Sequence, residues 1–365
     1  MTVARHATPE GTAAFAAERR HYGAADTPRG FDGLTLSSVG IGTYLGPSDT
    51  VTDRIYEAAI ARAFDLGCNV VDTAINYRCQ RSERAIGRAL AEGKIPREQI
   101  IVSTKGGYIP YDGEPPADPA AYFRQTFVAS GLLDPQDVVS GSHCLAPRFL
   151  VHQIERSLAN LNLACIDVYC LHNPEMQLEE IPVDRFYERM RAAFEALEGR
   201  VDAGQIRCYG IATWNGLRAS TGAAGLISLE RLAALARQLA GERHHFRVVQ
   251  LPYSLAMPEA YVRKNQTVRG TAMTPFEAAS ALDLYVVGSA VLYQNRLAQD
   301  LPGEIRSRVT GVETDAQRAI QFARSTPGIG TALVGMKQVS HVEENLRVLA
   351  APLLNAADID GLVPR

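Results

Sequence analysis

The sequence predicts an α/β protein folded as a (β/α)8 barrel. Short apolar segments alternate about eight times with segments of helical periodicity along the 365 residues, which is typical of a parallel sheet covered by helices. Polar side chains suited to catalysis follow the ends of several apolar segments, where such barrels carry their active sites. No glycine fingerprint follows the first strand, which disfavours an open dinucleotide-binding sheet.

The elements can be assigned in order along the chain. The first strand or hairpin is expected within 34–46, where Gly40 and Gly42 permit close approach of backbones. A helical period covers 49–66, and Gly67 suits its C-terminal cap. The other predicted elements are strand 69–73, helix 82–91, strand 99–105, helix 147–161, strand 165–172, helix 183–203, strand 206–213, an Ala- and Leu-rich helix, strand 246–253, helix 275–282, strand 284–290, helix 313–324, strand 330–335 and helix 340–349.

Domain boundaries follow from the same pattern. Residues 1–30 are polar and Ala-rich without a clear strand, which predicts a partly helical or mobile N-terminal extension. Residues 31–365 are predicted to form a single barrel domain. Three connections, 106–146, 252–274 and 291–311, are longer than ordinary loops. Each follows the C-terminal end of a strand, so we expect them to be walls or lids of the active site.

The overall composition is that of an ordinary soluble globular protein. The net charge of -3 and 21% charged residues show no basic footprint for nucleic acid. No apolar run reaches the roughly 20 residues of a membrane span, and the N-terminus lacks a signal-peptide core. The six cysteines form no CxxC pair and are expected to be free thiols. A cytoplasmic protein is therefore expected.

Four polar residues are expected to meet at the mouth of the barrel. Asp72, Lys105 and His172 end consecutive predicted strands, and Tyr77 lies in the loop after the first of them. Neighbouring strands lie about 5 Å apart, so the four side chains can form a set for proton transfer. An ammonium at Lys105 would lower the pKa of Tyr77, and Asp72 would hold the ammonium. Taken singly, each residue could also be a turn residue, a helix cap or a solvated side chain.

In these residues and their spacing, the chain resembles the aldo-keto reductase superfamily. The matching motifs are DTAINY around Asp72 and Tyr77, STK at Lys105, LHNP at His172, YGIATW at 209–214, Gln250, and VGMKQVSHVEENL near the C-terminus. The resemblance implies a (β/α)8 barrel that binds a nicotinamide dinucleotide, usually NADPH, across its mouth. It further implies that Tyr77 is the general acid for carbonyl reduction, with Lys105 and Asp72 lowering its pKa and His172 positioning the carbonyl.

The resemblance also implies positions near the nicotinamide. Gly42, Thr43 and Tyr44 match the stretch beneath it, Gln250 matches a carboxamide contact, and Ser289 matches a further contact. Where the family commonly has Ser-Asn before an aromatic residue, this chain has Ala212 and Thr213 before Trp214. One amide contact to the nicotinamide is therefore either missing or replaced by the Thr213 hydroxyl. Many members stack an aromatic ring on the nicotinamide from the position before Ser289, where this chain has Gly288.

Four residues match the adenine end of the cofactor. Glu344 and Asn345 match adenine-binding positions, and His341 replaces an arginine that many NADP-using members have. Lys337 lies close by and could contact the 2′-phosphate as a point charge, or could be an ordinary solvated cation. NADPH is therefore the expected cofactor, with NAD as an alternative.

Other functions stay open from the sequence. A Schiff-base aldolase would use Lys105 as its nucleophile, although the adjacent Asp72 would keep that lysine charged. A regulatory subunit could bind nucleotide without turnover and use 106–146 to contact a partner. A metal-dependent hydrolase is disfavoured, because no cluster has ligand spacing. The expected substrate is a small carbonyl or alcohol, and oligomeric state is open. The long loops offer eight aromatic residues for an elongated site: Tyr108, Tyr111, Tyr122, Phe123, Phe127, Tyr253, Tyr261 and Tyr293.

Overall fold

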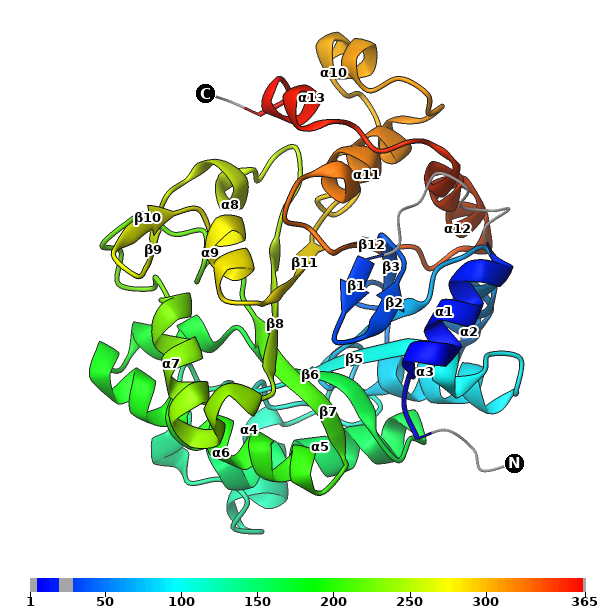
Figure 1. Cartoon of the computed structure of the whole chain (residues 1–365). Coiled ribbons are helices and arrows are strands. Elements are labelled where there is room, and N and C mark those ends of the chain that lie inside the picture. Colours follow the sequence, from blue (N-terminus) through cyan, green and yellow to red (C-terminus); the bar gives the residue numbers. More distant parts are fainter. Residues whose placement is uncertain (1–4, 20–28, 364–365) are drawn as a thin grey trace.

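Eight parallel strands close into a barrel in the computed structural model, which describes residues 5–19 and 29–363 (Figure 1). The strands follow one another around the barrel in chain order, and the last pairs with the first. This arrangement confirms the predicted fold class. The barrel strands are β3 (Val39–Gly42), β4 (Val70–Asp72), β5 (Ile101–Gly106), β6 (Ile166–His172), β7 (Ile206–Ala212), β8 (Phe246–Pro252), β11 (Tyr285–Ser289) and β12 (Thr331–Gly335).

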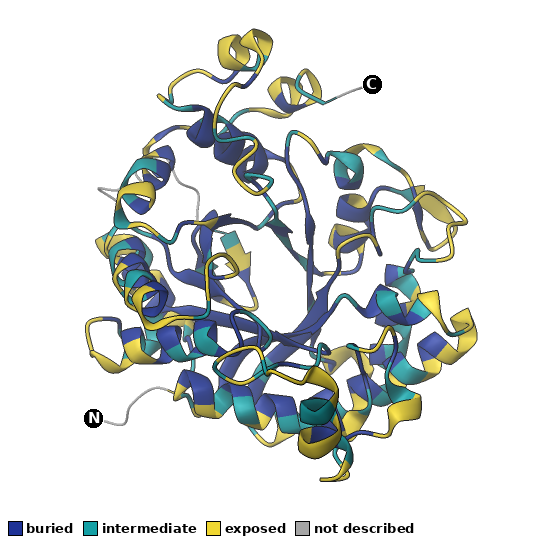
Figure 2. Ribbon diagram, turned by 180° about the vertical axis from the view of Figure 1, so that it is seen from behind, coloured by how far each residue is buried: buried dark blue, intermediate teal, exposed yellow. Residues whose placement is uncertain are grey.

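Helices surround the barrel, and most of them expose their outer faces (Figure 2). The helix Asp315–Ser325 is an exception, because nearly all of its residues are buried. The predicted helices agree with the observed ones to within a few residues, because caps and periodicity mark their ends. Asp49, for example, accepts a hydrogen bond from the backbone N–H of Thr52 at 2.7 Å and so caps the first of them. The outer helices are α2 (Thr50–Asp65), α3 (Arg81–Ala91), α5 (Pro147–Leu161), α6 (Val183–Asp202), α7 (Leu229–Ala240), α9 (Pro275–Ala281), α11 (Asp315–Ser325) and α12 (Val339–Leu346).

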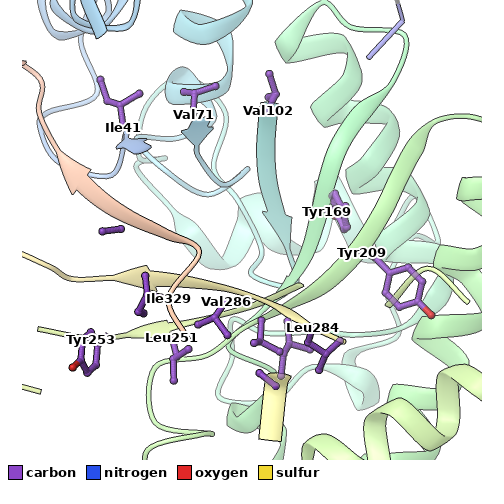
Figure 3. Close-up of a cluster of buried hydrophobic side chains, with 14 of the residues drawn as sticks. Ile41, Val71, Val102, Tyr169, Tyr209, Leu251, Tyr253, Leu284, Val286 and Ile329 are labelled. Atoms are coloured by element: carbon purple, nitrogen blue, oxygen red, sulfur yellow. The ribbon is translucent and has the colours of Figure 1, made fainter. Parts of the chain in front are cut away.

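Alternate residues of each barrel strand face opposite sides, as the period of two in a strand requires. The outward set packs against the helices, and Figure 3 shows members of this layer, among them Ile41, Val71 and Val102 on consecutive strands. The inward set fills the barrel interior with small and branched side chains such as Val70 and Ile101. The residues that continue the inward set at the ends of the strands therefore face the mouth.

A short hairpin closes the N-terminal end of the barrel. Strand β1 (Arg29–Phe31) pairs antiparallel with β2 (Leu34–Leu36), and Phe31, Leu34 and Leu36 join the interior cluster. Within the segment expected to hold a hairpin or the first strand, Leu34–Leu36 thus belongs to this hairpin and the first barrel strand begins at Val39. Part of the predicted N-terminal extension lies in residues 1–4 and 20–28, outside the described residues.

The described part of that extension packs against the barrel. Helix α1 (Pro9–Glu18) buries Phe15, whose ring centre lies 4.7 Å from that of Phe64 on α2. The backbone N–H of Ala7 donates to Asp167 Oδ1 at 2.8 Å. Helix α1 therefore shares the main core with the barrel helices.

The three long connections each contain ordered structure. Segment 106–146 holds α4 (Pro119–Phe123) and a π-helical turn (Arg124–Val128), and it shares a small apolar cluster with Phe149 of α5. Segment 252–274 holds α8 (Glu259–Val262) and a hairpin formed by β9 (Gln266–Val268) and β10 (Thr271–Met273). Segment 291–311 holds α10 (Gly303–Arg308). After α12, the chain continues to a last helix, α13 (Ala356–Asp360).

All six cysteines are buried and unbridged, as predicted. Among the described residues, no helix combines the length and the apolar character needed to cross a bilayer.

Removing the ring of Phe15 tests whether α1 is part of the folded barrel. Because the ring is buried against Phe64, Phe15→Ala is expected to lower the free energy of unfolding by about 3–5 kcal/mol in urea denaturation. The exposed Glu18 on the same helix supplies the control Glu18→Ala, expected to change it by less than about 0.5 kcal/mol. Equal effects of the two substitutions would show that α1 is an appendage.

Candidate active site

The four predicted catalytic residues lie together at the C-terminal mouth of the barrel. Asp72 and His172 are the last residues of β4 and β6, and Lys105 is the next to last of β5. Each continues the inward set of its strand, so its side chain points into the mouth. Tyr77 lies in the turn after β4, and all four line one cavity of about 230 Å³.

Lys105 and Asp72 form a buried ion pair beneath this cavity. Lys105 Nζ lies 2.5 Å from Asp72 Oδ2 and also donates to the backbone carbonyl of Thr73 at 2.7 Å. Burial alone would lower the pKa of Lys105, but the charges of Asp72 and Tyr77 act in the opposite direction and the pKa is raised overall. Lys105 is therefore an ammonium at neutral pH.

Tyr77 stands next to this ammonium. Lys105 Nζ lies 5.0 Å from the centre of the Tyr77 ring. Burial raises the pKa of Tyr77 above its ordinary value, and the charge and hydrogen bond of Lys105, which lower it, do not compensate. The net direction is opposite to the one expected from the sequence, because the desolvation of a buried phenol was not visible there. Tyr77 consequently keeps its proton at neutral pH, the form that a general acid needs.

His172 completes the group on the other side of Tyr77. The two ring centres lie 5.7 Å apart in an edge-to-face arrangement. Burial first, and then the charge of Lys105, lower the pKa of His172 well below its ordinary value, so the ring is neutral. Its Nδ1 is buried without a hydrogen-bond partner. Because a buried N–H without an acceptor is costly, the proton belongs on Nε2, which can then donate to an oxygen in the cavity.

A buried arginine that was not predicted supports the turn that carries Tyr77. Arg78 has a positive φ of 49°, as do the next two residues at 54° and 67°, a conformation that side chains seldom adopt. Its guanidinium donates to the carbonyls of Pro47 and Asp49 at 2.8 and 3.0 Å and to Asp53 Oδ1 at 2.6 Å. These bonds reach segments about thirty residues away, so local sequence patterns do not reveal them.

The residues predicted to lie near a nicotinamide line the same cavity. They are Gly42, Thr43, Tyr44, Thr213, Trp214, Gln250 and Ser289. Gln250 Nε2 reaches across the barrel to within 3.5 Å of Asp72 Oδ2, and Thr213 Oγ1 is buried without a partner. An unpaired hydroxyl and a primary amide at the floor, with aromatic rings at the rim, fit a flat ring that carries a carboxamide.

Gly288 does not face the cavity. A Cβ atom built on it would lie 3.1 Å from Ile329 and 3.8 Å from Tyr253, on the side of the strand that packs against the helices. The expectation that Gly288 occupies the position of a stacking ring is therefore wrong. Strand β11 presents Ser289, and not Gly288, to the mouth. Tyr44 and Trp214, 59% and 43% exposed, supply aromatic faces at the rim instead.

A buried carboxylate holds the turn that carries Trp214. Glu175 Oε1 accepts hydrogen bonds from the backbone N–H groups of Trp214, Asn215 and Gly216 at 2.6, 2.9 and 3.2 Å. Burial raises the pKa of Glu175, and these three bonds oppose the rise. Trp214 is thereby fixed at the cavity. Glu175 was not predicted, because it lies about forty residues before that turn and no local pattern connects the two.

Only one of the three predicted loop walls reaches the cavity. Residues 291–295 of the last long connection line it, together with the unpredicted Asn173 and Leu45. No residue of 106–146 or 252–274, all of which the structure describes, is part of this lining. Of the eight loop aromatic residues, Tyr293 alone lines it. The expectation of an aromatic-lined extended site is wrong for the others. Phe127 and Tyr253, for example, are buried, because Phe127 packs against α5 and Tyr253 packs against α9 and α11.

The predicted adenine-end residues lie beyond the cavity, after β12. Lys337 is half-buried, with Nζ 3.8 Å from where a Cβ on Gly46 would lie. His341 is exposed on α12, Glu344 is half-buried and Asn345 is buried. The side chain of Gln338 does not cap α12, so its first N–H groups stay available to an anion. Among residues 5–19 and 29–363, no three metal-ligating side chains are grouped.

Comparisons with known proteins agree with this geometry. A family model described as the aldo/keto reductase family matches residues 38–362. The chain is 28% identical over 190 residues to the NADH-specific methylglyoxal reductase of Escherichia coli, a stretch that covers 51% of each chain. It is 40% identical over 74 residues to an aldo-keto reductase of Mycobacterium ulcerans, covering 20% of this chain and 23% of that protein. The matches thus span about half or less of these relatives.

Two solved structures share the fold at low sequence identity. Aldo-keto reductase AKR11C1 from Bacillus halodurans in its holo form has a TM-score of 0.61 and 20% identity, covering 93% of this chain and 96% of that one. An aldo-keto reductase from Klebsiella pneumoniae in complex with NADPH has a TM-score of 0.62 and 18% identity, covering 92% and 94%.

Replacing Asp72 by asparagine tests the buried ion pair. At neutral pH, Asp72→Asn is expected to lower the free energy of unfolding by about 3–5 kcal/mol, because the ammonium of Lys105 stays buried without its counter-charge. The solvent-exposed carboxylate of Asp112, which pairs with arginines on the surface, provides the control Asp112→Asn, expected to cost less than about 1 kcal/mol.

The ion pair also predicts how the stability difference between Asp72→Asn and the wild type changes with pH. In the wild type the pKa of Lys105 is raised, so its contribution is present below the ordinary value near 10.5 and is lost only above it. In Asp72→Asn, burial, the largest influence on this ammonium, loses its main opponent, and the pKa of Lys105 is expected to fall below that value. The variant should then gain stability relative to the wild type as pH rises from about 7 to 10. A difference that stays constant over this range would contradict the assigned ion pair.

Proposed function

The chain belongs to the aldo/keto reductase family, and from this premise we propose that it is an NAD(P)H-dependent oxidoreductase that interconverts a small carbonyl compound and its alcohol. The observation that carries the proposal is the protonation pattern at the barrel mouth. A neutral phenol at Tyr77 and a neutral imidazole at His172 lie beside a buried ammonium at Lys105. Two donors and one fixed positive charge converge where negative charge develops on a reduced carbonyl oxygen.

Each residue has a distinct part in this mechanism. A bound nicotinamide would supply the hydride at its C4. His172 donates from Nε2 to the carbonyl oxygen and orients it. Tyr77 gives its proton to that oxygen as the carbon is reduced, and Lys105 stabilises the phenolate that remains. Asp72 keeps Lys105 charged and in place.

The cofactor site extends from the cavity to the N-terminus of α12. Thr213 and Gln250 would hold the carboxamide, and the rings of Tyr44 and Trp214 would enclose the nicotinamide. Lys337 would face the 2′-phosphate, which favours NADPH over NADH. The Klebsiella structure named above contains NADPH, whereas the Escherichia coli relative is NADH-specific, and NAD stays an alternative.

The other candidate functions fit the site less well. A Schiff-base aldolase needs a neutral amine at Lys105, whereas the pKa of Lys105 is raised by its partners; borohydride should trap no substrate adduct on this residue. A regulatory subunit without turnover would not need a phenol and an imidazole both placed to donate. The six unbridged cysteines support a cytoplasmic location for the enzyme.

Tyr77→Phe removes the proposed acid and leaves the ring. Turnover of an aldehyde is expected to fall about 10²- to 10⁴-fold, with the dissociation constant of NADPH unchanged. The control is Tyr122→Phe in the 106–146 segment, which should retain the wild-type rate. In the wild type, the rate of reduction should stay flat from about pH 6 to 8, because the raised pKa keeps Tyr77 protonated and the lowered pKa keeps His172 neutral. A Tyr77→Phe variant with near-wild-type turnover would remove this residue from the mechanism.

Lys337→Ala tests the phosphate contact. Loss of a charge-assisted contact of about 1.5–3 kcal/mol should weaken NADPH binding about 10- to 150-fold and leave NADH binding nearly unchanged. Binding can be followed by quenching of Trp214, the only tryptophan of the chain, which lines the cavity. The exposed Lys264 gives the control Lys264→Ala. If NADPH and NADH weaken equally, the phosphate is bound elsewhere.

A further inference from the structure

A second histidine lies directly behind His172 and has no place in the mechanism above. His143 is fully buried in the 106–146 segment and is not part of the cavity lining. Its Nε2 lies 2.7 Å from the backbone carbonyl oxygen of His172. The ring of Tyr108 stands edge-on to both imidazoles, with centres 5.1 Å from His143 and 4.9 Å from His172.

The hydrogen bonds around His143 run in one direction. Arg189 on α6 can only donate, and its Nη1 lies 2.5 Å from Gln177 Oε1. The amide of Gln177 is thereby oriented so that its Nε2 donates to His143 Nδ1 at 2.9 Å. With Nδ1 accepting, the proton of the neutral ring is on Nε2 and is donated to His172. Burial lowers the pKa of His143 to about 4, so the ring stays neutral over the working range of pH.

The backbone next to this contact is shaped to leave room for it. Gly107 has a φ of +128°, a conformation that side chains rarely adopt. A Cβ atom at this position would lie 3.0 Å from His143 Nε2 and 3.3 Å from the carbonyl oxygen of His172. Any side chain at residue 107 would therefore press on both ends of the hydrogen bond.

We propose that His143 is a positioning residue, which fixes the peptide of His172 and through it the imidazole that orients the carbonyl. His172 is the last residue of β6, where the strand ends and the chain turns away. A donor from behind sets the direction of its carbonyl group and therefore of its Cα–Cβ bond. The proposal deepens the proposed function and rests on it. The 106–146 segment would then support the catalytic histidine from outside the cavity.

Two substitutions at His143 separate positioning from simple packing. His143→Phe keeps an aromatic ring but removes the donor, and hydride transfer from NADPH in single-turnover experiments should fall about 10- to 100-fold, as activity does when the hydrogen-bond partner of a metal-bound histidine is removed. His143→Gln restores an N–H donor and should recover most of that rate. The dissociation constant of NADPH should be unchanged in both, and His152→Gln on α5 is the matched control.

Gly107→Ala approaches the same bond from its other side. It leaves both histidines in the chain but crowds the hydrogen bond, so it should lower the single-turnover rate in the same sense as His143→Phe. Wild-type rates in Gly107→Ala and His143→Phe, or a His143→Gln variant as slow as His143→Phe, would overturn the proposal.

The tautomer of His143 can be measured without any turnover. ¹⁵N NMR of the imidazoles should show His143 as the neutral Nε2–H form down to about pH 5, well below the ordinary histidine pKa near 6.5. A proton on Nδ1 would overturn the proposal, because Nε2 could then not donate to His172. This readout is independent of the reaction. A protein that shows the expected tautomer but reduces no carbonyl would contradict the proposed function alone.

Discussion

The ion pair between Lys105 and Asp72 is the constraint on which the rest of the site depends. Two charges buried beneath the barrel mouth are stable only if each finds its partner and further hydrogen bonds. The 2.5 Å contact, the carbonyl of Thr73 and the amide of Gln250 provide them. The pair places a permanent positive charge next to a phenol that burial keeps protonated. The charge cannot make Tyr77 a phenolate in the resting protein, but it is in place to stabilise the phenolate once the proton has left.

The groups around this pair are held by contacts that come from outside the cavity. Arg78 ties the turn of Tyr77 to the segment before α2, and Glu175 gathers three N–H groups of the turn that carries Trp214. His143 lies behind His172 in the same way. Each of these supports is a buried polar group with several partners, and each joins segments far apart in the chain. Together they hold the side chains at the mouth in one arrangement, which catalysis by positioned donors requires.

The sequence could predict the barrel and the polar residues at the ends of its strands, because both follow from the alternation of inward- and outward-facing side chains along each strand. The inward set that begins with Val70 and Ile101 ends at Asp72 and Lys105, so locating the strands also located the mouth. The supporting residues could not be found, because their partners lie thirty to forty residues away and no local pattern links them. The direction of the Tyr77 pKa was missed for a related reason. It depends on how deeply the phenol is desolvated, and burial is a property of the folded chain. The prediction for the loop aromatic residues failed because a long segment can bury its rings against the outer helices, as 106–146 does with Phe127 against Phe149 of α5.

The most direct test of the central claim follows the hydrogen itself. The protein would be incubated with an aldehyde and NADPH that carries deuterium at C4, and the alcohol would be analysed by mass spectrometry and NMR. We predict that deuterium appears on the former carbonyl carbon, and that the same reaction with ordinary NADPH in heavy water places none there. An alcohol that takes its carbon-bound hydrogen from solvent, or no alcohol in the presence of bound NADPH, would contradict this assignment of the site.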